Sequence, residues 1–160
     1  MTRIRLGLGV DLHRRDEGRT LYLGGIPFNG EPGLAGHSDG DVVCHAVADA
    51  LLGAGGLSDL GEHYPDTDPA FEGLPGLDLL AGVVAELRKR GLVPASCDFT
   101  LIAERPQIAG RREEMRMSLA AALGIPPGEV SVKATRPEGL GLTGDGAGCI
   151  AIASVEPGSA

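Results

Sequence analysis

Two residues near the start of the chain and a third one much later constrain the fold most. Asp11 and His13 lie two apart in Gly9-Val10-Asp11-Leu12-His13, so on a β-strand both side chains point to the same face. His45 comes from a separate segment that only folding can bring near them. One carboxylate and two imidazoles make three metal ligands, which leaves a fourth position for water or substrate. The set predicts an open, catalytic type of zinc site. The alternative is a turn-capping aspartate and two ordinary histidines.

The composition limits the class of protein. With 160 residues, the chain is long enough for one domain, which we expect to span residues 1–160. The net charge of −8 argues against nucleic acid or an anionic membrane as a partner, because both attract basic surfaces. The negative net charge would also repel a phosphate ligand, so such a ligand would need cations close to its binding site. The three cysteines are widely spaced with no CxxC, which favours a reducing cytoplasm. We find no signal peptide and no apolar run long enough to cross a bilayer.

Alternating strand and helix patterns predict an α/β (α+β) fold, with a mixed sheet covered by helices on one face. We expect a turn-rich segment over 27–36 and a long, functional loop over 54–76. The predicted strands are 4–10, 20–23, 97–103, 130–135 and 149–155, and the predicted helices are 38–53, 77–90 and 111–123.

The segment around His45 carries further polar groups. Asp41, His45 and Asp49 are four apart and share one helix face, so Asp49 is a candidate to orient the His45 imidazole. Cys44 is interpreted as a small buried residue. Ser38 or Asp39 would cap this helix, and His37 and Ser38 would then lie at its N-terminus, where unpaired N–H groups favour anions. Simple capping without any ligand is the alternative.

Three further stretches have both a functional and an ordinary interpretation. The carboxylates of residues 59–68 suit recognition of a sugar or polyol, although Asx turns also explain such a run. Residues 103–108 follow a strand, where exposed backbone can contact a base edge. In 133–141, Thr135 or Arg136 could hold a phosphate and Glu138 a hard cation such as Mg²⁺. A solvated turn with a weak ion pair is the alternative there.

Taken together, these segments resemble the 2-C-methyl-D-erythritol 2,4-cyclodiphosphate synthase family of the non-mevalonate isoprenoid pathway. The resemblance runs from Ile4 to about Val155. The matching motifs are Asp11-Leu12-His13, His37-Ser38-Asp39-Gly40-Asp41, His45, Asp49-Ala50-Leu51-Leu52-Gly53, Tyr64-Pro65-Asp66-Thr67-Asp68-Pro69-Ala70-Phe71, Lys133-Ala134-Thr135 and Glu138-Gly139-Leu140-Gly141-Leu142-Thr143-Gly144.

The resemblance implies a homotrimer with active sites between subunits, and a metal-dependent, cyclising phosphorus–oxygen lyase. The substrate would be 4-diphosphocytidyl-2-C-methyl-D-erythritol 2-phosphate, and the products the cyclic diphosphate and CMP. Asp11, His13 and His45 would bind Zn²⁺, and Glu138 would help to hold Mg²⁺ or Mn²⁺. His37, Thr135 and Arg136 would act on the phosphates. The implied substrate-binding residues are Ser38, Asp59, Leu60, Gly61, Tyr64, Pro65, Asp66, Thr67, Asp68, Ala103, Pro106, Gln107, Ile108, Ala109, Thr135 and Glu138.

The chain departs from the family pattern at several positions. Arg136 replaces a common threonine and Gln107 a usual lysine. Leu142 and Asp145 stand where members that bind an isoprenoid diphosphate on the trimer axis tend to have Phe and Arg, so we expect that site to be absent or weak. A non-catalytic relative that binds cytidine nucleotides is therefore an alternative, and a zinc hydrolase is a more remote one.

Overall fold

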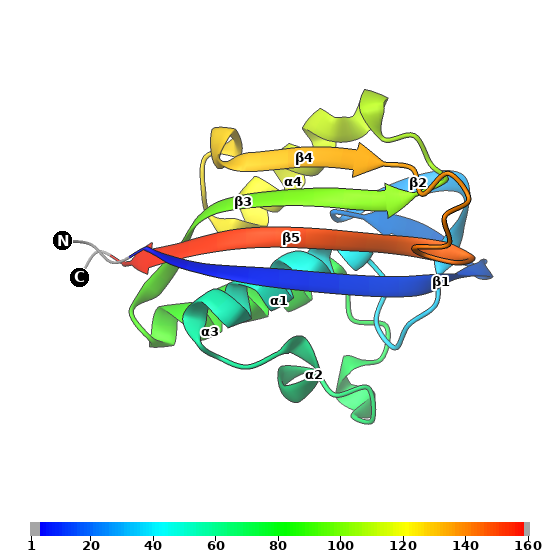
Figure 1. Cartoon of the computed structure of the whole chain (residues 1–160). Helices are drawn as coiled ribbons and strands as arrows, with labels where there is room; N and C mark the ends of the chain where they lie inside the picture. Colours follow the sequence, from blue (N-terminus) through cyan, green and yellow to red (C-terminus); the bar gives the residue numbers. More distant parts are fainter. Residues whose placement is uncertain (1–3, 159–160) are drawn as a thin grey trace.

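The computed structural model describes residues 4–158, in which one curved sheet forms a layer and the longer helices cover one of its faces (Figure 1). The strands are β1 (Arg5–Leu23), β2 (Ile26–Leu34), β3 (Leu92–Ala103), β4 (Val130–Thr135) and β5 (Gly146–Pro157). Their order in the sheet is β2-β1-β5-β3-β4. Only the β3–β4 pair is parallel among these neighbours, so the sheet is mixed, as predicted.

The helices α1 (Val42–Gly55), α3 (Gly76–Lys89) and α4 (Arg112–Leu123) lie behind the sheet in Figure 1. The short helix α2 (Leu60–His63) and three 3₁₀ turns, η1 (Pro69–Phe71), η2 (Ala109–Arg111) and η3 (Pro127–Glu129), complete the described elements. The prediction of helices on one sheet face is confirmed. No helix between residues 4 and 158 combines the length and the apolar character that crossing a bilayer requires.

The first two strands form a hairpin that the sequence pattern indicated only in part. The strands predicted at 4–10 and 20–23 belong to one long strand, β1. It ends at Gly24-Gly25, and both glycines have the positive φ that a two-residue hairpin turn requires. The segment 27–36 was predicted as turns, but most of it is β2. Its proline and glycine residues are tolerated because β2 is an edge strand.

Helix α1 packs unusually close to β1. A Cβ atom on Gly7 would lie 2.0 Å from the Ala50 carbonyl oxygen, and one on Gly9 would lie 2.0 Å from that of Ala46. Only glycine permits this approach of backbone to backbone. The contact fixes the first turn of α1 against the part of β1 that carries Asp11.

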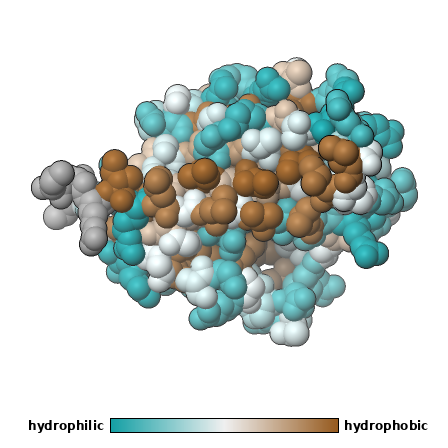
Figure 2. All heavy atoms as spheres, viewed as in Figure 1, coloured by the Kyte–Doolittle hydropathy of each residue, from teal (hydrophilic) through white to brown (hydrophobic). Residues whose placement is uncertain are grey.

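The apolar side chains in the first half of β1 point away from the helices, whereas Leu21 and Leu23 near its end are buried in the core. Figure 2 shows the outward-pointing side chains as a brown band that crosses the exposed face of the sheet. Together with two side chains of β5, they form the outward apolar stripe, whose members are 42% to 70% exposed: Ile4, Leu6, Leu8, Val10, Leu12, Ile150 and Ile152. Over residues 6–13, glycines and metal-binding residue types therefore occupy the helix-facing side of β1, and leucine and valine occupy the open side.

Candidate metal centre and a second cavity

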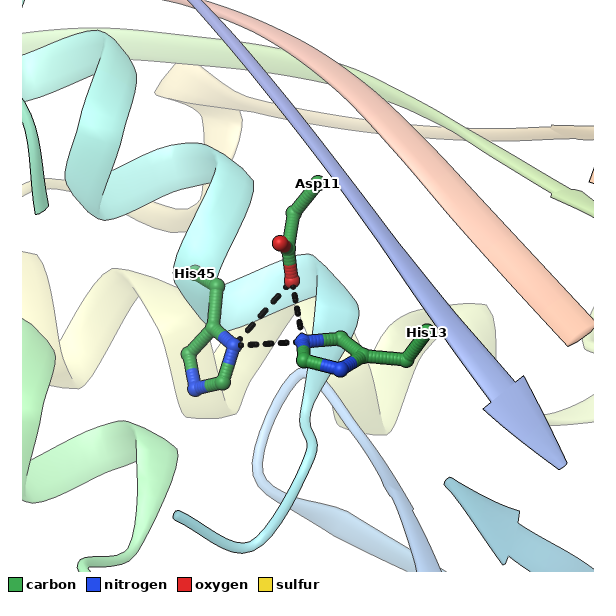
Figure 3. Close-up of side chains that lie close together, drawn as sticks. All are labelled: Asp11, His13 and His45. Carbon is green, nitrogen blue, oxygen red and sulfur yellow. Dashed lines mark hydrogen bonds and ion pairs between the residues drawn. The ribbon is translucent and has the colours of Figure 1, made fainter. Parts of the chain in front are cut away.

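Asp11, His13 and His45 converge on one point between β1 and α1 (Figure 3). Asp11 Oδ2 lies 2.7 Å from His13 Nε2 and 3.1 Å from His45 Nδ1. The two imidazole nitrogens are 3.1 Å apart. Asp11 and His13 share the helix-facing side of β1, as their spacing predicted, and the close packing of α1 supplies His45.

This triangle of atoms fits a cation better than it fits hydrogen bonding alone. Protons could satisfy the two contacts with the carboxylate, but the two ring nitrogens would still face one another. Four ligands at about 2.0 Å around a tetrahedral Zn²⁺ lie roughly 3.3 Å from one another, close to the separations seen here. The group could therefore hold a metal ion with one coordination position left over.

The other nitrogen of each ring has its own partner. His45 Nε2 lies 2.9 Å from Ser38 Oγ, and His13 makes a backbone hydrogen bond with Ala35. If these distal nitrogens carry the ring protons, the nitrogens in the triangle present lone pairs. Ser38 and Ala35 thus favour the tautomers that metal binding requires.

The acid–base properties of the group follow from its geometry. Burial opposes ionisation of Asp11, but hydrogen bonds and charge interactions with His13 and His45 outweigh it and lower the pKa of the carboxyl group. Burial likewise opposes protonation of His13, but the hydrogen bond and the charge of Asp11 outweigh it and raise the pKa of the imidazole. Without a metal, the centre therefore holds an ionised carboxylate against a readily protonated histidine.

Two predictions about the surroundings of His45 were wrong. Asp49 makes no hydrogen bond with His45, because the Asp49 carboxylate accepts the Leu60 N–H at 3.0 Å. Ser38 is instead the residue that contacts the His45 imidazole. Neither Ser38 nor Asp39 caps α1. The cap is Asp41, whose buried carboxylate accepts N–H bonds from Val43 and Cys44 and also from the Gly24-Gly25 turn.

Residues 35–41 form the segment that joins β2 to α1, and we call it the 35–41 loop. His37 lines the cavity beside the metal centre and its Nε2–H donates to the Asp68 carbonyl at 2.9 Å. Since α1 begins at Val42, His37 and Ser38 lie on this loop and not at the helix N-terminus. Cys44 is buried, as interpreted, and its thiol donates to Asp41.

A cavity of about 490 Å³ opens at the metal centre. The predicted residues that line it are Asp11, His13, His37, Ser38, His45, Leu60, Gly61, Tyr64, Pro65 and Asp66. Three predicted binding residues, Asp59, Thr67 and Asp68, do not line it. Asp59 and Asp68 instead cap α2 and η1 through their carboxylates, which is the Asx-type role considered as the alternative.

Four further residues line this cavity and were not predicted from the sequence: Gly36, Phe71, Leu74 and Leu79. The three apolar residues come from η1, from the segment before α3 and from α3 itself. An apolar residue in a helix or a loop does not reveal whether it faces a core or a cavity, so no sequence signal distinguished them.

A second, smaller cavity of about 200 Å³ lies where β3 and β4 end. All seven residues predicted around the nucleotide and its phosphates on this side line it: Ala103, Pro106, Gln107, Ile108, Ala109, Thr135 and Arg136. Ala134 and Arg112 complete the lining and were not predicted. Arg112 and Arg136 bring two guanidinium groups to a site from which the lysine expected at Gln107 is missing.

The two cavities do not merge within one chain. Residues paired directly across neighbouring strands point to the same face of a sheet. Thr135 is linked to Leu12 in this way, through the pairs Thr135–Ile102, Ile102–Gly148 and Gly148–Leu12. Thr135 therefore lies on the outward face with Leu12, whereas Asp11 and His13 face the helices. Strands β1 and β4 are also three strand spacings apart, or about 14 Å. Glu138 is exposed and lines neither cavity.

Comparison with known proteins decides the family. A sequence profile described as the YgbB family matches residues 4–156, nearly the whole chain. This chain belongs to the YgbB family.

Proteins with established names are similar over most of this chain. A protein of Trichlorobacter lovleyi named 2-C-methyl-D-erythritol 2,4-cyclodiphosphate synthase is 48% identical over 95% of this chain and 97% of its own length. A protein of an Anaeromyxobacter strain named bifunctional enzyme IspD/IspF is 53% identical over 94% of this chain. The chain spans only 39% of that bifunctional relative.

The fold of this chain is also seen in solved structures. One of them is described as 2C-methyl-D-erythritol-2,4-cyclodiphosphate synthase in a CDP-bound form. It superposes with a TM-score of 0.86 at 33% identity, and the match covers 94% of this chain and 99% of that one.

Proposed function

We propose that this chain is a 2-C-methyl-D-erythritol 2,4-cyclodiphosphate synthase. It would convert 4-diphosphocytidyl-2-C-methyl-D-erythritol 2-phosphate to the 2,4-cyclodiphosphate and CMP. The observation that carries the proposal is the intact triangle of Asp11, His13 and His45 at the mouth of a cavity lined by the residues that the motifs predicted. The names of the full-length relatives support the same reaction.

In the proposed reaction, an oxygen of the 2-phosphate attacks the β-phosphorus of the diphosphate. The bond between that phosphorus and the bridging oxygen breaks, and CMP leaves with the electron pair. The enzyme is a lyase in this sense, because the ring closes without water. The nucleophile is already anionic, so the main requirement is to align the phosphates and to offset their repulsion.

We propose Zn²⁺ for the Asp11–His13–His45 centre, where its charge would stabilise a phosphoryl oxygen. A second ion, Mg²⁺ or Mn²⁺, would bind with the help of Glu138. His37 and Ser38 lie beside the centre and would orient phosphate oxygens, while Asp49 keeps only a structural contact. Leu60, Gly61 and the residues 64–66 would line the methylerythritol part of the substrate.

The second cavity would bind the cytidine portion. Ala103 and the residues 106–109 would surround the base, and Thr135 with Arg136 would contact the phosphates. Arg112 adds a positive charge to this cavity and so compensates for the lysine that is absent at position 107. This compensation makes a non-catalytic relative the less favoured alternative. The CDP-bound neighbouring structure agrees with a cytidine ligand for this fold.

We further propose a homotrimer with each active site shared between two subunits. The outward apolar stripe supports the assembly, since a soluble monomer seldom exposes a continuous band of this kind. The separation of the two cavities supports shared sites. Asp145 and Leu142 are exposed near one end of the stripe and support our expectation of a weak axial site for an isoprenoid diphosphate. The free, buried thiols agree with the predicted cytoplasmic location.

The activity is tested by measuring CMP release from the substrate with Zn²⁺ and Mg²⁺ present. We expect turnover by the unmodified chain and a loss of at least about 100-fold in His45→Gln, since an amide is a poor zinc ligand. His63→Gln is the matched control, because His63 lies outside the cavity and donates only to the Leu57 carbonyl. CMP binding without turnover in the unmodified chain would favour the non-catalytic alternative.

A further inference from the structure

Arg19 of β1 contacts the 35–41 loop on both sides of His37. Its Nη1–H donates to the carbonyl of Gly36 and its Nη2–H donates to the carbonyl of Ser38. The side chain is half-buried and is not part of the cavity lining. One guanidinium group therefore spans the stretch that carries the two phosphate-orienting residues of the proposed site.

The opposite side of the same loop is held by backbone contacts with residues 73–76. The Gly73 N–H donates to the His37 carbonyl at 2.8 Å, and the Asp39 N–H donates to the Leu74 carbonyl at 3.2 Å. The Asp39 carboxylate accepts the Gly76 N–H at 2.7 Å. Arg19 supplies the matching contacts from the sheet, so the loop is fixed between β1 and the segment before α3.

The backbone of Arg19 packs closely against the neighbouring strand β2. Gly33 of β2 lies against it, and a Cβ atom on Gly33 would lie 2.6 Å from the Arg19 carbonyl oxygen and 2.7 Å from the Arg19 Cβ. A planar guanidinium with several donors in a fixed fork can bridge two carbonyls, whereas a lysine ammonium offers a single point of charge. The contact is thus specific for arginine at this position.

We propose that Arg19 is a positioning residue of the cyclising site, which acts by holding His37 toward the cavity and Ser38 against His45. The inference rests on the proposed function, because it assigns these two side chains to the phosphates. A shift of the loop would move His37 and Ser38 together, and displacements of about 1 Å at a reacting centre can cost roughly 100-fold in rate.

The test compares Arg19→Lys with Arg116→Lys. Arg116 also donates to a backbone carbonyl, that of Val130, but it lies on α4 away from the loop. For Arg19→Lys we expect kcat to fall about 10- to 100-fold while KM changes much less, with one zinc per chain retained. Amide hydrogen exchange over residues 35–41 should accelerate in Arg19→Lys and stay unchanged in Arg116→Lys.

A second variant separates positioning from a general loss of structure. In Arg19→Ala, added guanidinium ion at low millimolar concentration should restore part of the lost kcat, which it would not do for a chain that is merely unfolded. Unchanged kcat and unchanged exchange in Arg19→Lys would overturn the proposal, as would a loss of activity that only follows a loss of zinc. Absence of turnover in the unmodified chain would count against the proposed function instead, and the exchange measurement would still decide whether Arg19 holds the loop.

Discussion

Among single residues, His13 links the metal centre to pH. Its raised pKa means that a proton stays on the imidazole at higher pH than usual in the metal-free chain. Zinc must displace that proton, since a ligating nitrogen needs its lone pair. Lowering the pH through the pKa of His13 therefore weakens zinc binding, and raising the pH strengthens zinc binding until the imidazole is neutral.

We therefore expect the zinc affinity of the metal-free chain to increase by about tenfold per pH unit below the pKa of His13 and then to level off. Isothermal titration in buffers with different ionisation enthalpies should report proton release that rises toward one per zinc as the pH falls below the pKa of His13. Affinity that is constant between about pH 6 and pH 8 would contradict this account of the centre.

Ser38 and Asp49 offer a second test at this scale, because only Ser38 contacts His45. Ser38→Ala should weaken zinc binding about 10- to 100-fold, as expected when a partner of a ligating imidazole is removed. Ser38→Thr keeps the hydroxyl and should bind zinc nearly as well as the unmodified chain. Asp49→Asn should leave zinc affinity unchanged, and a clear loss there would restore Asp49 to the role predicted from the sequence.

At the scale of elements, the contact between α1 and β1 determines whether the metal centre forms. Gly9→Ala should lower the free energy of unfolding by about 1–3 kcal/mol or more, because the new Cβ would overlap the Ala46 carbonyl. Gly53→Ala in α1 is the matched control. A Cβ there would meet only the Gly7 Cα at 3.8 Å, and better helix propensity should stabilise the chain by about 0.5–1 kcal/mol.

Chemical denaturation of the metal-free proteins measures both changes, and their opposite signs are the decisive result. Equal effects of the two substitutions would show that the close packing at Gly9 is not required.

The same elements show what the sequence could and could not reveal. Periodicity predicted β4 to the residue and placed the metal ligands on a strand and a helix, since both depend on local spacing. It did not predict β2, whose prolines and glycines suit an edge strand, or the start of α1, which depends on the distant Gly24-Gly25 turn bound by Asp41. For the second cavity, the residues alone suggested a base contact at 103–108 and a phosphate contact at Thr135 or Arg136, but only the family resemblance joined the two, because residues 103–109 carry little distinctive side-chain chemistry.

At the scale of the whole molecule, shared active sites make a prediction that a monomeric enzyme would not meet. His45→Gln damages the metal half of a site, and Glu138→Gln damages the half that the neighbouring subunit would supply. Each variant alone should be nearly inactive. Co-expressed in equal amounts, they should form mixed trimers in which roughly a quarter of the sites combine two intact halves and regain activity.

The mass in solution should accompany this result. Sedimentation equilibrium should give about three times the chain mass of 16.4 kDa for the unmodified protein. Val10→Asp in the outward apolar stripe should lower that mass. A monomeric mass, or mixed samples with no more activity than the separate variants, would refute shared sites.

Between residues 6 and 13, strand β1 serves two surfaces at once: the even-numbered residues belong to the outward apolar stripe, and the odd-numbered ones face α1 and the metal centre. Inserting or deleting one amino acid before Asp11 would exchange these two sets, placing the carboxylate among the leucines and a leucine beside His45. The spacing of residues 5–13 is therefore fixed, and natural variants of this protein should carry substitutions at the outward positions 6, 8, 10 and 12 without gaps in this stretch.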